Sequence, residues 1–209
     1  MQKYICNLTF CFLLISIISC AQKDSKSRTT DYSIDNSVLK EIENKIEPFN
    51  LKANANISWT VFENDKIAST GNEEGEPALA FTSFIDNQIA IDCLNGVDNG
   101  FGFALVISSD TSILKLKVLS NNEALLFRKS HNSGFQPELL VPCLTKNITF
   151  ANQPKFDKEE IVQGKIDLES EPFYELSNGK ERKINFKLTA YFKSEPLPVI
   201  GNNYKTLKK

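Results

Sequence analysis

The chain has 209 residues, with 24 Lys and Arg, 26 Asp and Glu, a single His and a formal net charge of −2. This balance excludes the strongly basic surface of a nucleic-acid-binding protein and the charge block of an acidic tail. One histidine also excludes any metal site or proton relay that needs two imidazoles.

An apolar segment near the N-terminus has the charge order of an export signal. Lys3 precedes it, no acidic residue lies within it, and residues 4–18 are apolar except for interruptions at Cys6, Asn7 and Thr9. A helix that crosses the hydrocarbon core needs about 20 apolar residues, so this segment is too short and too polar to span a membrane. We therefore predict that residues 1–19 form a cleaved signal peptide.

The end of this segment, Ile17-Ile18-Ser19-Cys20, resembles the lipobox of bacterial lipoproteins. The resemblance implies cleavage before Cys20, a diacylglycerol on its thiol and an acyl chain on its amine, which together hold a protein durably on a membrane. Ala21, in place of an Asp, implies sorting to the outer membrane of the cell envelope. The alternative is an ordinary signal peptide in which a cysteine follows the cleavage site by chance.

The composition changes twice after the lipobox. Residues 20–36 are rich in Ser, Thr, Lys and Asp and predict a lipidated, flexible tether. Residues 37–198 have the length of one domain with its own core, and residues 199–209 predict a mobile basic tail. Without residues 1–19 the chain has 23 basic and 26 acidic side chains, so its net charge is −3.

The first predicted element of the domain is a helix. Val38, Leu39, Ile42 and Ile46 recur at helical spacing, and Pro48 ends the pattern, so we expect a short helix over residues 36–46 with one apolar face.

From residue 51 onward the apolar period changes to two, which is typical of half-buried strands. Pairs of turn-forming residues at 64–65, 86–87 and 178–179 predict hairpins. Residues 101–108 are apolar on both faces and predict a central strand. We also expect residues 113–119 and 124–128 to form a hairpin around 121–122, and 139–143 to be an edge strand or a strand end because of Pro142. The remaining strands are predicted at 148–151, 162–169, 173–176 and 183–193.

About ten strands at this spacing, with no alternation of strands and helices, predict an all-β fold. We expect an antiparallel β-sandwich or barrel with one short N-terminal helix.

Two cysteines remain in the predicted domain. Cys93 and Cys143 both lie on the apolar side of an alternating run, and the chain is bound for an oxidising compartment. We predict a disulfide between them, with two separately buried thiols as the alternative.

Candidate catalytic chemistry is sparse. His131 lies in a cationic, Gly-containing stretch, residues 128–134, which is either an anion-binding or Ser/His loop or a solvated surface loop. The surface loop is favoured, because no Gly-x-Ser-x-Gly elbow is present. Asp92, Asn95, Asp98 and Asn99 carry oxygen ligands but lack the spacing and the distal Glu of a Ca²⁺ loop, so no metal is expected.

Acidic and aromatic side chains offer two further possibilities. Glu73, Glu74 and Glu76 form an acidic run that is either solvated or part of a carboxylate pair. Outward Tyr174 and Tyr191 are candidates for stacking on a sugar, whereas Trp59 shares the parity of core residues. No phosphate-binding loop, Cys-x-x-Cys pair or dinucleotide fingerprint occurs, so no cofactor is expected.

These observations favour a lipid-anchored envelope protein that binds a protein or glycan ligand without catalysis. One alternative is an envelope hydrolase that uses the loop carboxylates Glu73, Glu74 or Asp98. Another is an inhibitor or immunity lipoprotein with a tight protein partner.

Overall fold

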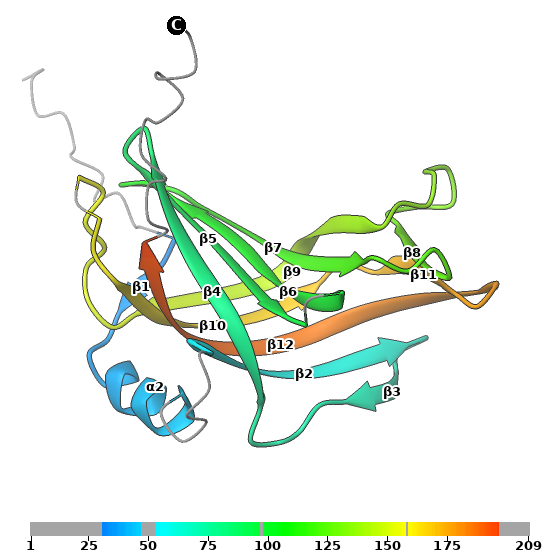
Figure 1. Ribbon diagram of the computed structural model, residues 1–209, viewed down its shortest axis with the longest axis horizontal. Coiled ribbons are helices and arrows are strands. Elements are labelled where there is room, and N and C mark those ends of the chain that lie inside the picture. The colour runs from blue at the N-terminus through cyan, green and yellow to red at the C-terminus, as the bar shows by residue number, and fades with distance from the viewer. Residues whose placement is uncertain (1–30, 47–52, 97, 158, 197–209) are drawn as a thin grey trace, which may run out of the picture.

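The computed structural model describes residues 31–46, 53–96, 98–157 and 159–196 (Figure 1). The predicted signal peptide with Cys20, residues 20–30 of the predicted tether and the predicted tail lie outside these residues. Among the described residues, no helix has the length and apolar character needed to cross a membrane.

The described chain is an antiparallel β protein with one short helix, which confirms the predicted fold class. The elements are β1 (Ser33–Ile34), α2 (Val38–Ile46), β2 (Ala55–Glu63), β3 (Lys66–Thr70), β4 (Glu76–Ile85), β5 (Gln88–Asn95), β6 (Asn99–Ile107), β7 (Ser112–Ser120), β8 (Leu125–Arg128), β9 (Glu138–Phe150), β10 (Val162–Ser170), β11 (Phe173–Ser177) and β12 (Lys180–Pro196).

The strand pairings close on themselves. Neighbouring strands follow the order β2-β4-β5-β6-β7-β9-β10-β12, and β12 pairs back onto β2. β3 extends the sheet beside β2, while β11 and β8 extend it beyond β10 as an arm (Figure 1). Of the two predicted architectures, the sandwich and the barrel, the pairings match the barrel, because one sheet closes on itself.

Phenylalanines fill the interior of this ring. Phe103 of β6 and Phe150 of β9 both pack on Phe192 of β12, with ring centroids 5.6 and 6.3 Å apart, and all three are fully buried. Gly164 of β10 makes room for this contact, because a Cβ there would lie 3.0 Å from the ring of Phe192 and 3.2 Å from that of Phe150. Opposite walls of the ring are therefore joined by direct aromatic packing.

The helix forms close to its predicted position. Asp35 accepts a hydrogen bond from the Ser37 amide before the first turn, which is the usual role of an Asp at a helix start. Val38 and Ile42 are buried, and α2 packs against β10 and β12 on the outside of the ring.

The predicted hairpin turns are also confirmed. Asn64 and Asp65 join β2 to β3, and Asp86 and Asn87 join β4 to β5, all with positive φ values between 49° and 63°. The β11–β12 turn at residues 178–179 has the same left-handed backbone. Asn and Asp tolerate this conformation better than other residues with side chains.

One predicted hairpin and one predicted strand boundary are wrong. β7 does not form a hairpin with β8, because β7 pairs with β6 and β9, while β8 pairs with β11. The strands predicted at 139–143 and 148–151 are one continuous strand, β9, which pairs with β7 through residues 138–142 and with β10 through residues 143–150. Pro142 is tolerated because it lies where β9 changes neighbours, next to the register shift at Ser170.

The cysteine prediction is also corrected, since Cys93 and Cys143 are both free. Across the sheet, Cys93 of β5 lies opposite Phe103 of β6, and Phe103 lies opposite Leu116 of β7. Leu116 in turn lies opposite Val141 of β9, two residues before Cys143. Three interstrand spacings, about 14 Å along the sheet, separate β5 from β9. A disulfide needs Cα atoms within about 7 Å, so the shared parity places both thiols inside without bringing them together.

Burial of these thiols predicts a loss of stability at alkaline pH. Burial, assisted by the negative charge of Asp92, raises the pKa of Cys93 far above its usual value, and burial also raises the pKa of Cys143. In the unfolded chain both thiols ionise above about pH 8.5, whereas the folded chain keeps them protonated. The free energy of unfolding should therefore fall above about pH 9, by up to roughly 1.4 kcal/mol per pH unit for Cys93.

Urea unfolding between pH 8 and 11 measures this slope in a Cys20→Ser chain without residues 1–19, and Cys93→Ala should flatten it. The unfolded, unreduced chain should also show two reactive thiols. Absence of free thiol in that state would mean that a disulfide forms after all.

Candidate functional site

Two rows of polar side chains cross the outer face of four neighbouring strands. The strand registers align Ser58 of β2, Thr189 of β12, Asp167 of β10 and Asn147 of β9 in the first row. The second row consists of Thr60, Lys187, Glu169 and Thr145 on the same strands. Side chains within a row are about 4.8 Å apart, and the rows are about 7 Å apart.

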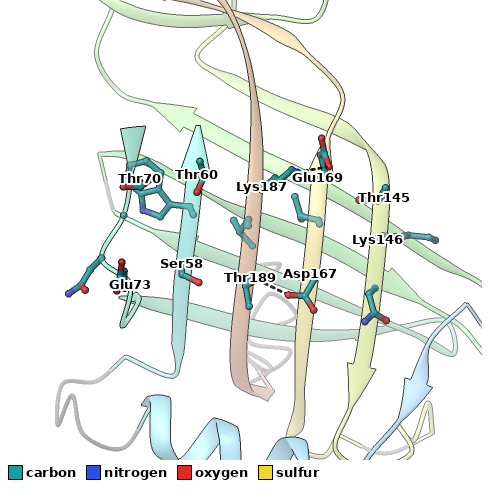
Figure 2. Close-up of a pocket in the computed structure, with 16 residues that line it drawn as sticks. Ser58, Thr60, Thr70, Glu73, Thr145, Lys146, Asp167, Glu169, Lys187 and Thr189 are labelled. Atoms are coloured by element: carbon teal, nitrogen blue, oxygen red, sulfur yellow. Dashed lines mark hydrogen bonds and ion pairs between the residues drawn. The ribbon is translucent and has the colours of Figure 1, made fainter. Parts of the chain in front are cut away.

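These rows form the floor of a concavity, which we call the polar trough (Figure 2). Thr70, Gly71, Asn72 and Glu73, at the end of β3 and in the following turn, line one side of the trough. The cavity measures about 630 Å³ and is open to solvent. This volume lies in the usual range for small-ligand sites.

The floor of the polar trough has its charges internally compensated. Lys187 Nζ lies 3.4 Å from a carboxylate oxygen of Glu169, and Thr189 donates a 2.6 Å hydrogen bond to Asp167. Lys165, the next outward residue of β10, lies 3.9 Å from the same Asp167 carboxylate. The trough therefore presents mixed donors and acceptors rather than a field of one sign.

Helix α2 covers one end of the trough. The Tyr191 hydroxyl donates a 2.9 Å hydrogen bond to Glu41 of the helix, and Lys165 Nζ lies 3.8 Å from the same carboxylate. Burial and the hydrogen bond to Glu41 raise the pKa of Tyr191. Burial alone would lower the pKa of Lys165, but its contacts with Tyr191, Asp167 and Glu41 outweigh that effect and raise it.

The wall of the trough packs directly on Trp59. The Gly71 amide donates a 3.0 Å hydrogen bond to the Trp59 carbonyl, and a Cβ at position 71 would lie 2.5 Å from the indole Nε1. The indole also packs on Phe101 and Phe186, with centroid distances of 5.1 and 6.4 Å. The prediction that Trp59 belongs to the core side is consistent with these contacts, and its edge reaches the trough lining.

The predicted loop carboxylates do not form one cluster. Glu73 lines the trough, whereas Asp98 accepts a 3.4 Å hydrogen bond from Asn121 beyond the end of β7. Glu74 lies in the turn after β3, where its amide donates to Asn72 and its carbonyl accepts from Lys45 of α2. Glu76 instead accepts a hydrogen bond from Asn95.

The four oxygen-bearing residues considered for Ca²⁺ each have a different partner. Asp92 forms a 2.6 Å ion pair with Lys117, Asn95 contacts Glu76, and Asn99 accepts from Ser120. Within the described part of the chain, no group of three His, Cys, Asp or Glu residues is arranged to hold a metal ion.

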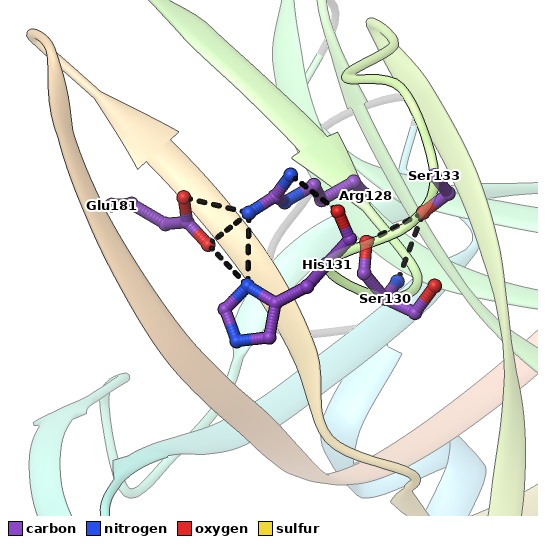
Figure 3. Close-up of polar contacts among 5 residues, drawn as sticks. All are labelled: Arg128, Ser130, His131, Ser133 and Glu181. Carbon is purple, nitrogen blue, oxygen red and sulfur yellow. Dashed lines mark hydrogen bonds and ion pairs between the residues drawn. The ribbon is translucent and has the colours of Figure 1, made fainter.

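His131 belongs to a polar cluster at the tip of the arm (Figure 3). Arg128 donates two hydrogen bonds to Glu181, at 2.7 and 2.9 Å, and another to the His131 carbonyl. Arg128 Nη2 lies 3.0 Å from His131 Nδ1, which also lies 3.6 Å from a carboxylate oxygen of Glu181. The guanidinium also stacks over Phe135 at 4.6 Å.

The serines of this loop have structural partners as well. Ser133 donates to the Ser130 carbonyl and accepts from the Ser130 amide, which closes a turn. The His131 ring packs on Tyr174 at a centroid distance of 4.1 Å. These contacts favour the interpretation of the segment as a surface loop, held to β11 and β12 by Arg128.

Comparison of the chain with protein-family models, with curated proteins and with solved structures finds no match. The function is therefore inferred from the geometry of the site.

Sequence reasoning did not identify the polar trough. Its residues have the ordinary alternation of a solvated strand face, and only the registers of β2, β12, β10 and β9 bring them together. The one available signal was the high share of Ser, Thr, Asn and paired charges on the outer faces of these strands.

Removal of Arg128 should destabilise the arm without affecting the trough. Arg128→Ala deletes the ion pair with Glu181 and two ring contacts, so the free energy of unfolding should fall by about 1–2 kcal/mol. The exposed neighbour change Lys129→Ala is the matched control and should have almost no effect. Urea unfolding measures both, and equal midpoints would show that the cluster contributes nothing.

Proposed function

We propose that the chain is a lipid-anchored protein of the cell envelope that binds its ligand in the polar trough without catalysing a reaction. The observation that carries the proposal is the trough itself, a cavity of about 630 Å³ whose floor is fixed on four hydrogen-bonded strands. The lipobox at Cys20 supports attachment to a membrane, and Ala21 supports the outer membrane.

The pairing of the polar groups supports binding rather than catalysis. Asp167 and Glu169 lie on one strand and contact Thr189 and Lys187, so neither faces the other across a substrate. A glycosidase needs two carboxyl groups on either side of the scissile bond. His131, the single histidine, lies at the tip of the arm and contacts Arg128.

The hydrolase alternative retains one supporting observation, because Glu73 lines the same trough as Asp167 and Glu169. Under that alternative Glu73→Gln would abolish turnover of an envelope substrate while leaving the domain folded. The inhibitor or immunity alternative requires instead a protein bound in the trough.

Lipidation can be measured directly. Cys20→Ser removes the thiol that would carry the diacylglycerol, so the variant should lose fatty-acid labelling and remain an uncleaved precursor in the cell. Metabolic labelling with an alkyne fatty acid, followed by gel mobility, reads both effects. Cys11→Ser, within the same segment, should label normally, and labelled Cys20→Ser would contradict the anchor.

Occupancy of the trough can be measured in intact envelopes. A photo-cross-linking amino acid at Thr145, on the floor of the trough, should give a defined adduct in the full-length protein. The same group at Ser83, on the outward face of β4, is the matched control and should give none. Equal capture from both positions, or none from Thr145, would overturn binding in the trough.

A further inference from the structure

We infer that the ligand of the polar trough is a neutral, hydroxyl-rich chain, that is, an oligosaccharide or polysaccharide strand. This inference rests on the proposed function and adds the chemical class of the ligand.

The two central strands of the trough floor, β12 and β10, have no open edge for a peptide strand. β12 and β10 each have hydrogen-bonded neighbours on both edges, and β2 lies between β12 and β3 along the second row. A bound peptide gains most of its affinity at a sheet edge through main-chain hydrogen bonds. The centre of the floor can therefore contact a ligand only through side chains.

The side chains of the floor also lack the features of a protein interface. All eight outward residues of the two rows are polar, whereas Leu168 and Leu188 point into the core. Tight protein interfaces depend on a central cluster of aromatic or aliphatic anchors. A folded protein partner would find no such anchor on the floor.

Charge argues against a strongly ionic ligand. Lys187, the cation of the floor, lies 3.4 Å from Glu169, and Asp167 is engaged by Thr189 and Lys165. An anionic ligand such as a phosphate would meet the carboxylates of Glu73, Asp167 and Glu169, and a cationic one would have to compete with Lys187 for Glu169. Paired charges instead act as strong donors and acceptors for neutral hydroxyl groups.

Uncharged groups complete the match. Ser58, Thr60, Thr70, Thr145 and Asn147 line the trough, each with a side chain that can both donate and accept hydrogen bonds. They lie at both sides of the charged centre, so a chain of hydroxyl-bearing rings could be contacted along its length. Phe62, the next outward residue of β2, adds an aromatic ring at the open end, 5.4 Å from Lys187 Nζ.

The protein contains its own reporter of occupancy. Trp59 is the single tryptophan of the chain, and its indole lies against Gly71 in the wall of the trough. A ligand on the floor should change the environment of this indole, so tryptophan fluorescence follows binding without a label.

The test titrates the signal-less Cys20→Ser chain, residues 20–209, with soluble, neutral cello-, xylo- and chito-oligosaccharides. We expect a saturable fluorescence change with at least one of these probes. Thr60→Ala/Thr145→Ala removes a hydroxyl from each end of the second row and should weaken that affinity about tenfold. Ser83→Ala/Thr111→Ala removes two hydroxyls outside the trough and should leave it unchanged, and thermal unfolding verifies that both variants fold.

Three results would overturn the inference. The first is the absence of a saturable fluorescence change with any probe. The second is an equal oligosaccharide affinity in the two double variants. The third is binding that added salt abolishes, as expected for an ionic ligand. The photo-cross-linking experiment separates the inference from the proposed function. A defined protein adduct at Thr145 without oligosaccharide binding refutes the glycan class and leaves binding in the trough intact. No adduct and no oligosaccharide binding refute both.

Discussion

The alternation of side chains along β12 is the constraint on which the rest of the structure depends. This 17-residue strand pairs with β10 and β11 along one edge and with β2 and β4 along the other, so it closes the ring of strands. Its inward residues, such as Phe186 and Phe192, are buried, and its outward residues Lys187 and Thr189 lie in the polar trough. A slip of one residue would exchange the two sets, which the cost of burying a lysine forbids.

The core and the polar trough are therefore the inner and outer faces of the same strands. Contact of Phe103 and Phe150 with Phe192 fixes the register from within, and the same register aligns the rows of the trough outside. The strand pairing holds the floor of the trough in place without a ligand, so the proposed binding would cost the protein little conformational entropy. The arm differs, because β8 and β11 add only short pairings and depend on Arg128 to hold the loop that follows.

Sequence patterns predicted the elements that depend on the spacing of adjacent residues. They failed for the features that depend on pairing between strands far apart in the sequence. The period of two, the short helix and the Asn/Asp turns at 64–65 and 86–87 all appear as expected, because each reflects the preferences of adjacent residues. The partner of β7 does not follow from such preferences, since β9 lies about twenty residues further along. The alternation of side chains likewise placed Cys93 and Cys143 on the inner face of the sheet. It carried no information on β6 and β7, the two strands that separate them. The trough was missed for the same reason, since its rows draw residues from positions 58 to 189.

A membrane anchor would complement a site of this kind. Ten residues lie between Cys20 and Asp31, which is fixed beside Ser112 and Lys146, and such a segment spans at most about 40 Å. A protein so attached stays next to the membrane and to any polymer in the adjoining layer. Shallow contacts through hydroxyl groups give modest affinity one at a time, but confinement raises the effective concentration of the ligand. A polar trough without an apolar anchor is therefore adequate for a protein that meets its ligand on the same surface, whereas a freely diffusing protein would need a deeper site.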